Sequence, residues 1–195
     1  MNSINFIVQK FKSLDNFSKW NLFIGGTMVL TVLFLYFKYT SFAYEFHLSM
    51  VPDGLNVSKI IYVNEQGLGL GPGDNETGII VYELSDTIAA KVQRVGVSYF
   101  VNMPPNKGEN RKWRGDYSHW NSTPVLSEEG TPALPSTLKI SKYLNQYGFG
   151  LEIDPLIEKQ IDDALSNSRS YVGYGRTGMI IVAPEIKRVF YAYAG

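Results

Sequence analysis

The chain has 195 residues, with no cysteine and with His47 and His119 as its two histidines. The lack of cysteine excludes disulfide bonds, thiolate metal ligands and a cysteine nucleophile. Two histidines are too few for a metal site built from several imidazoles. The 18 basic and 18 acidic side chains cancel, whereas proteins that bind nucleic acids usually carry a basic excess. The composition therefore predicts no metal, no cofactor and no nucleic-acid partner.

Charge is also absent from one long stretch, residues 20–37, which reads WNLFIGGTMVLTVLFLYF. At ~1.5 Å of rise per residue, a helix of this length covers roughly 27 Å, close to the ~30 Å of a bilayer's hydrocarbon core. Trp20 lies at one end of the stretch and Tyr36 and Tyr39 lie at the other, as in an interfacial aromatic belt. The stretch is therefore predicted to be a transmembrane helix in contact with the lipid bilayer.

The flanking charges predict the orientation of this helix. Lys10, Lys12 and Lys19 precede it, and Lys38 alone follows it closely. The positive-inside rule then places the N-terminus in the cytoplasm and the C-terminal domain outside, in the periplasm of a Gram-negative cell. A cleaved secretory signal is the alternative, because residues 41–43 form a small-x-small triplet. The apolar stretch exceeds the ~7–15 residues usual for such signals, and we therefore favour an uncleaved anchor.

The sequence thus divides into a leader over residues 1–19, a span over 20–37 and an extracytoplasmic domain over 45–195. The leader is basic, and its apolar residues recur at three- and four-residue spacing: Ile4, Ile7, Val8, Phe11, Leu14 and Phe17. This spacing predicts an amphipathic helix on the inner leaflet. A frayed cytoplasmic tail is the alternative, because short isolated helices are marginal in water.

Residues 45–195 carry alternating signals for strands and helices. Strands are predicted over 58–63, 78–84, 169–174, 178–183 and 185–194, and helices over 86–99, over 138–147 and from 155 onward. Ser85 and Asp154 are the expected N-caps of two of these helices. Residues 103–136 hold five of the nine prolines and predict a long irregular loop.

This order of elements predicts an α+β domain, with an antiparallel sheet and helices packed on one face. Over residues 58–194 the order resembles that of the extracytoplasmic PAS-like sensor fold. The resemblance implies a similar fold and carries no function with it.

Aromatic and cationic side chains gather within the predicted loop. Tryptophan, tyrosine and arginine are typical of binding hot spots, and loops carry function disproportionately. The predicted binding residues are Arg111, Trp113, Arg114, Tyr117, His119 and Trp120, extended by Tyr174 and Arg176. The alternative is that the rings fold back and close the core beneath the loop.

Each catalytic motif in the sequence has a simpler structural explanation. Residues 173–178 match G-x-G-x-x-G, but a strand follows where a dinucleotide site needs a helix, so a tight turn is predicted. Residues 136–139 match S-x-x-K without the other elements of a serine acyl-enzyme. Asp116 and His119 are suitable for a general base with Ser118 or Ser122, or for a metal site with Glu128. Because a loop does not fix that geometry, no catalytic residue is predicted.

Three classes of function fit these features. The first, which we favour, is a non-enzymatic membrane protein whose outer domain binds another envelope or membrane protein, or a second copy of itself. The second is suggested by the order of the segments. A basic leader is followed by one span, over roughly residues 1–45, and then by a larger outer domain, and this layout looks like that of T4-type holins. That resemblance implies a phage lysis protein with a periplasmic regulatory domain. The third is a sensor-like domain, or one that binds or hydrolyses cell wall.

Overall fold

The computed structural model describes residues 15–67, 76–125, 139–176 and 178–195. The chain divides into two compact units, Met1–Glu45 and Phe46–Gly195. The predicted leader lies outside the described residues over 1–14, as does residue 177, the fifth position of the glycine motif.

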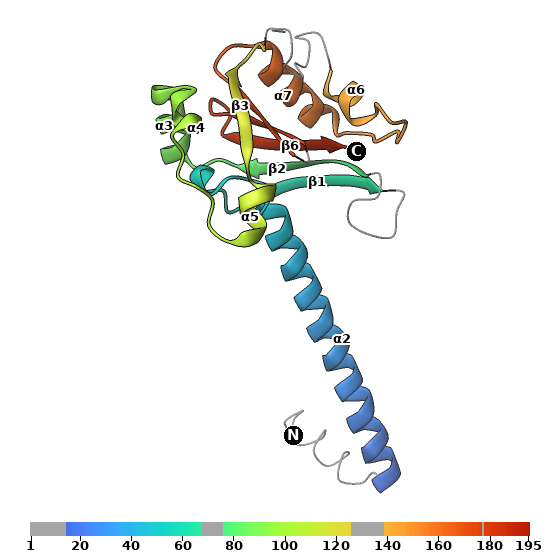
Figure 1. The fold of residues 1–195 in the computed structure, drawn as a ribbon. Helices are drawn as coiled ribbons and strands as arrows, with labels where there is room; N and C mark the ends of the chain where they lie inside the picture. The colour runs from blue at the N-terminus through green and yellow to red at the C-terminus, as the bar shows by residue number, and fades with distance from the viewer. Residues whose placement is uncertain (1–14, 68–75, 126–138, 177) are drawn as a thin grey trace, which may run out of the picture. The chain divides into compact units, whose positions relative to one another are not determined.

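Helix α2, Asn16–Leu48, is continuous over 33 residues (Figure 1). Among the described residues it is the one helix long and apolar enough to cross a membrane, a test that an N-terminal signal sequence also passes. The hydroxyl groups of Thr27 and Thr31 donate to the carbonyl oxygens of Phe23 and Thr27, each at 2.9 Å. These bonds satisfy the two hydroxyls within the helix itself, as an apolar environment requires.

The second unit is built on a six-stranded antiparallel sheet with the order β1-β2-β6-β5-β4-β3. The strands are β1 (Ile60–Gly67), β2 (Glu76–Glu83), β3 (Tyr117–Ser122), β4 (Tyr171–Gly175), β5 (Met179–Ala183) and β6 (Arg188–Ala194). All neighbouring strands pair antiparallel. The antiparallel sheet and the α+β class confirm the sequence prediction.

Helices cover both faces of this sheet, so the prediction of helices on one face was wrong. One face packs against α3 (Asp86–Val95) and α4 (Ser98–Val101), with the short helix η1 (Asp53–Leu55) in the same core. The other packs against α6 (Ile140–Leu144) and α7 (Pro155–Ser166), which Figure 1 shows together on one side.

The physical reason lies in the central strands. From Thr77 to Tyr82, every residue of β2 is buried, and β5 is buried throughout. A strand with one wet face alternates apolar and polar residues, whereas a strand covered on both faces reads as a continuous apolar run. The runs IIVY in β2 and MIIVA in β5 are of the second kind.

Most of the predicted elements are confirmed. Ser85 caps α3 by accepting from the N–H of Ile88 at 3.4 Å. The carboxylate of Asp154 caps α7 by accepting from the N–H groups of Leu156 and Ile157 at 2.8 and 3.2 Å. The segment 185–194, ambiguous between helix and strand, contains strand β6. The helix predicted to reach residue 99 ends at Val95, because Gly96 adopts a φ of 69°.

The predicted irregular loop over 103–136 was wrong in part. It contains helix α5 (Glu109–Arg114) and the edge strand β3, while residues 126–138 lie outside the described residues. Strand β3 is short, and its register shifts between Ser118 and Asn121. His119, at this irregularity, has a φ of 51°. A polar strand interrupted by a bulge lacks the alternation by which strands are recognised in sequence.

Candidate functional site

The predicted binding residues do not form one surface, because two of the aromatic rings turn into the core. Tyr117 is 9% exposed, and its hydroxyl donates to the carbonyl oxygen of Met50 at 2.6 Å. Trp120 stacks on Phe100 with ring centroids 4.2 Å apart and an interplanar angle of 16°. The indole N–H of Trp120 donates to the Tyr117 carbonyl oxygen at 3.2 Å. For these two residues, the structure has the rings closing the core.

Two further predicted residues lie apart from the rest. Tyr174 packs against the core on the α6 and α7 side of the sheet, whereas Tyr117 and Trp120 belong to the core on the other side. His119 is exposed, and its Nδ1 lies 2.8 Å from the hydroxyl oxygen of its neighbour Ser118. Within the described part of the chain, no three histidine or acidic side chains gather as metal ligands. Glu128 lies outside that part.

Arg111 ties α5 to the segment that follows α2. Its guanidinium contacts the carboxylate of Asp53 and donates to the carbonyl oxygen of Leu48 at 2.9 Å. The Asp53 carboxylate also accepts from the backbone N–H of Lys107 at 2.6 Å. Burial raises the pKa of Asp53, but the bonds from Lys107 and Arg111 outweigh it and lower the pKa overall. Arg111 therefore has a positioning role.

Asn106 and Gly115 complete this local frame. The Asn106 side chain accepts from the N–H of Asp53 and donates to the carbonyl oxygen of Gly115, each at 2.8 Å. A Cβ on Gly115 would lie 3.2 Å from the carbonyl oxygens of Arg111 and Val51. The backbone after α5 thus passes too close to its neighbours to accept a larger residue without a shift.

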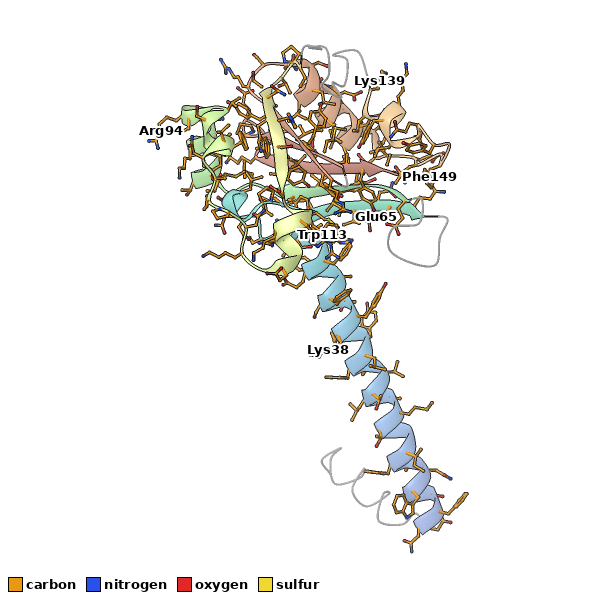
Figure 2. All side chains as sticks on the ribbon, in the orientation of Figure 1. Lys38, Glu65, Arg94, Trp113, Lys139 and Phe149 are labelled. Carbon is orange, nitrogen blue, oxygen red and sulfur yellow. The ribbon has the colours of Figure 1, made fainter. Side chains whose placement is uncertain are left out.

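The remaining predicted residues gather around one exposed indole. Trp113 on α5 is 44% exposed (Figure 2). The Cζ atoms of Arg114 and Arg176 lie 4.9 and 5.9 Å from the centroid of its ring. Arg114 also lies 4.4 Å from the ring centroid of Phe46. These four residues, here called the Trp113 cluster, are joined by cation–π contacts and come from three separate segments of the chain.

Within the described residues, the basic side chains in and near the cluster differ in their ion pairs. Lys112 pairs with Glu109 at 2.8 Å, and Arg111 pairs with Asp53. No carboxylate within the described ranges lies at ion-pair distance from Arg114 or Arg176. Two guanidinium groups near an exposed indole thus present hydrogen-bond donors and an apolar ring to a ligand outside the domain.

The glycine motif contains Arg176, one of the four residues of the Trp113 cluster. Gly175 donates its N–H to the carbonyl oxygen of Gly178 at 2.8 Å and so closes the turn between β4 and β5. A Cβ on Gly173 would lie 2.8 Å from the Trp120 ring, and one on Gly175 would lie 2.8 Å from the Tyr117 ring. The predicted turn between strands is confirmed, and its first two glycines make room for the partly buried ring of Trp120 and the buried ring of Tyr117.

Comparison with protein-family models, with curated proteins and with solved structures finds no match for this chain. The function is therefore argued from the cluster itself. Sequence reasoning missed Phe46, Asp53 and Asn106, which position or complete the cluster. The sequence Pro52-Asp53-Gly54 does signal a turn after the apolar helix, but no spacing links that turn to α5, 54 residues or more further along the chain.

Proposed function

We propose that the chain is a single-pass membrane protein whose folded domain, Phe46–Gly195, binds another envelope protein and catalyses no reaction. One observation carries this proposal: Trp113 is exposed, Arg114 and Arg176 both lie near its ring, and neither guanidinium has a carboxylate partner within the described residues. Tryptophan and arginine are the residues most enriched in binding hot spots. The planar guanidinium also matches the geometry of carboxylate groups on a protein partner.

The composition of the cluster favours binding over catalysis. Indole, phenyl and guanidinium groups exchange no proton near neutral pH, so they suit contact and orientation rather than acid–base chemistry. The sequence-derived catalytic candidate, His119, projects from an edge strand at a bulge and bonds to its own neighbour Ser118. Phe46 follows the predicted span by nine residues, which favours a partner that is itself at the membrane.

Site-specific photocrosslinking in the source cell tests the proposal. A benzophenone amino acid replaces Trp113 in one variant and Val101, which is 71% exposed on α4, in the other. We expect a crosslinked protein at position 113 and none at 101. Adding Arg176→Gln should reduce the yield several-fold, whereas adding Arg94→Gln, which removes an equally exposed charge on α3, should not.

The identity of the crosslinked product decides between partners. A second envelope protein supports the proposal, and a product that contains this chain alone assigns the cluster to self-association. Equal yields at positions 113 and 101 contradict a specific binding surface at the cluster.

A further inference from the structure

We propose that, when no protein partner is bound, the Trp113 cluster contacts the phosphate-bearing lipid headgroups of the bilayer that α2 spans. This inference depends on the membrane anchor of the proposed function and does not depend on the protein partner. The bilayer would then compete with that partner for Arg114 and Arg176.

The connection between the predicted span and the cluster is short. Phe46 lies nine positions after Phe37, the end of the predicted span. Even fully extended, nine residues reach about 30 Å. Arg114 contacts the Phe46 ring directly. The distance from the bilayer surface to Arg114 is therefore at most a few ångströms longer than this connection, whatever the orientation of the domain.

The connecting segment is rich in exposed aromatic side chains. Tyr39, Phe42 and Tyr44 follow the predicted span, and their side chains are 71%, 69% and 40% exposed. Amphipathic aromatic side chains are enriched at the level of the headgroups, where one end of the ring is apolar and the other is wet. The chain between the span and the cluster therefore already has the composition of a bilayer interface, and the cluster's Phe46 and Trp113 continue it.

The charge of the cluster is complementary to that of lipid phosphates. Arg114 and Arg176 have no carboxylate partner among the described residues, and the one acidic side chain of α5, Glu109, pairs with Lys112 at 2.8 Å. Guanidinium groups bind phosphate oxygens through two parallel hydrogen bonds. A lipid phosphate layer supplies the missing anions, and the apolar interior of the headgroup region accepts the exposed indole of Trp113.

The test uses the full chain in vesicles of phosphatidylcholine and phosphatidylglycerol in equal parts. Because the chain lacks cysteine, a single cysteine carries one fluorophore, either at Lys112 on α5 or at Ser166, the exposed last residue of α7. Ser166 lies on the opposite face of the sheet from the core that Phe46 packs against. A lipid with a headgroup quencher then reports contact of each position with the phosphate layer.

We expect strong quenching at position 112 and weak quenching at 166. Arg176→Gln should lower the ratio of contacting to free domain roughly five-fold, the effect of one cation at an anionic surface. The charge-matched Arg94→Gln should leave the ratio unchanged. Salt at about 0.5 M should also lower it, because the exposed charges are then screened over a few ångströms. Equal quenching at 112 and 166, or equal effects of the two glutamine variants, would overturn the inference.

Failure of this inference can be told apart from failure of the proposed function. If position 112 is unquenched in pure lipid but position 113 crosslinks to an envelope protein in cells, the cluster is a protein site and the lipid contact is wrong. If quenching depends on Arg176 and no protein crosslinks, the lipid contact stands and the protein partner is wrong.

Discussion

Trp113 and Trp120 lie seven residues apart, and the fold gives the two indoles opposite environments. Trp120 stacks on Phe100 at 4.2 Å in the core, while Trp113 stays 44% exposed and lies near two guanidinium groups. The difference comes from what lies opposite each ring. Trp120 faces Gly173, where a Cβ would approach the ring to 2.8 Å, so a missing side chain makes room for it.

Tyr117 extends the same comparison. Its ring faces Gly175, and its hydroxyl has a buried carbonyl acceptor on Met50. Trp113 instead makes cation–π contacts with the charged groups of Arg114 and Arg176. The three rings look alike in sequence. The glycines on the neighbouring strand make room for Tyr117 and Trp120, which are structural, whereas Trp113 is available to a ligand.

The largest effect on stability should follow from Trp120→Ala. The substitution removes a ring that stacks on Phe100 and covers Gly173, and leaves a cavity at the edge of the core. We expect a loss of about 3 kcal/mol in the free energy of unfolding, at the lower end for tryptophan because the side chain is only partly buried. Urea denaturation followed by circular dichroism measures it.

Trp120→Phe is the matched control, because it keeps an aromatic ring over Gly173. It should retain more than half of the stability that Trp120→Ala loses. Ordinary surface substitutions change stability by less than about 0.5 kcal/mol. A loss in this range for Trp120→Ala would show that Trp120 is not a core residue and that the two indoles do not differ in their contribution to stability.

The next largest effect should follow from Asp53→Ala. This substitution tests how α5, the helix that carries the exposed Trp113, is held in position. The carboxylate accepts from the Arg111 guanidinium and from the N–H of Lys107, and bonds to a charged group contribute about 1.5–3 kcal/mol. With partly exposed partners, we expect a loss of about 2 kcal/mol. Thermal or urea unfolding of Asp53→Ala, Arg111→Ala and the double variant measures the coupling. Additive losses would contradict a direct interaction.

Some parts of this fold follow from local sequence, and others depend on contacts between distant segments. Ser85 and Asp154 could be assigned as helix caps because a cap bonds within its own first turn. The apolar runs in β2 and β5 identify strands locally, whereas the helices that cover the two faces of these strands come from distant segments. The bulged strand β3 escaped recognition because His119 breaks the period-two pattern.

The candidate site divides in the same way. The sequence pointed to Trp113, Arg114 and Arg176 through residue type alone, and the structure brings these three together. The sequence alone does not separate these three from Tyr117 and Trp120, because the glycines that make room for the latter two rings come more than 50 residues later. Phe46 was missed for the same reason: its contact with Arg114 joins segments with no shared local pattern.

Acidification should have a smaller effect on stability. It acts on Glu65 of β1, which is linked to His47 near the end of α2. Glu65 accepts from the Tyr193 hydroxyl at 2.7 Å and lies 3.1 Å from Nε2 of His47. Burial raises the pKa of Glu65, but the bonds to His47 and Tyr193 outweigh it and lower the pKa below its usual 4.5. The ionised carboxylate therefore stabilises the fold above pH 4.5, and this contribution is lost as the pH falls through the lowered value.

Glu65→Gln isolates this contribution from that of other carboxylates. Between pH 6 and pH 3 the wild type should lose about 1 kcal/mol more stability than the variant, the usual contribution of one hydrogen bond. Urea midpoints across that pH range measure the difference. Parallel pH profiles for the two proteins would show that Glu65 is not held in its ionised form by these partners.

The smallest effect on stability should come from Trp113→Ala, the counterpart of Trp120→Ala. The indole is 44% exposed and makes cation–π contacts with Arg114 and Arg176, so the free energy of unfolding should change by less than about 0.5 kcal/mol. The same substitution should abolish the difference in headgroup quenching between labels at 112 and 166. A residue that matters little for folding and much for contact is a binding residue. If Trp113→Ala instead unfolds the domain as readily as Trp120→Ala, both indoles are structural, and the cationic surface has no aromatic anchor.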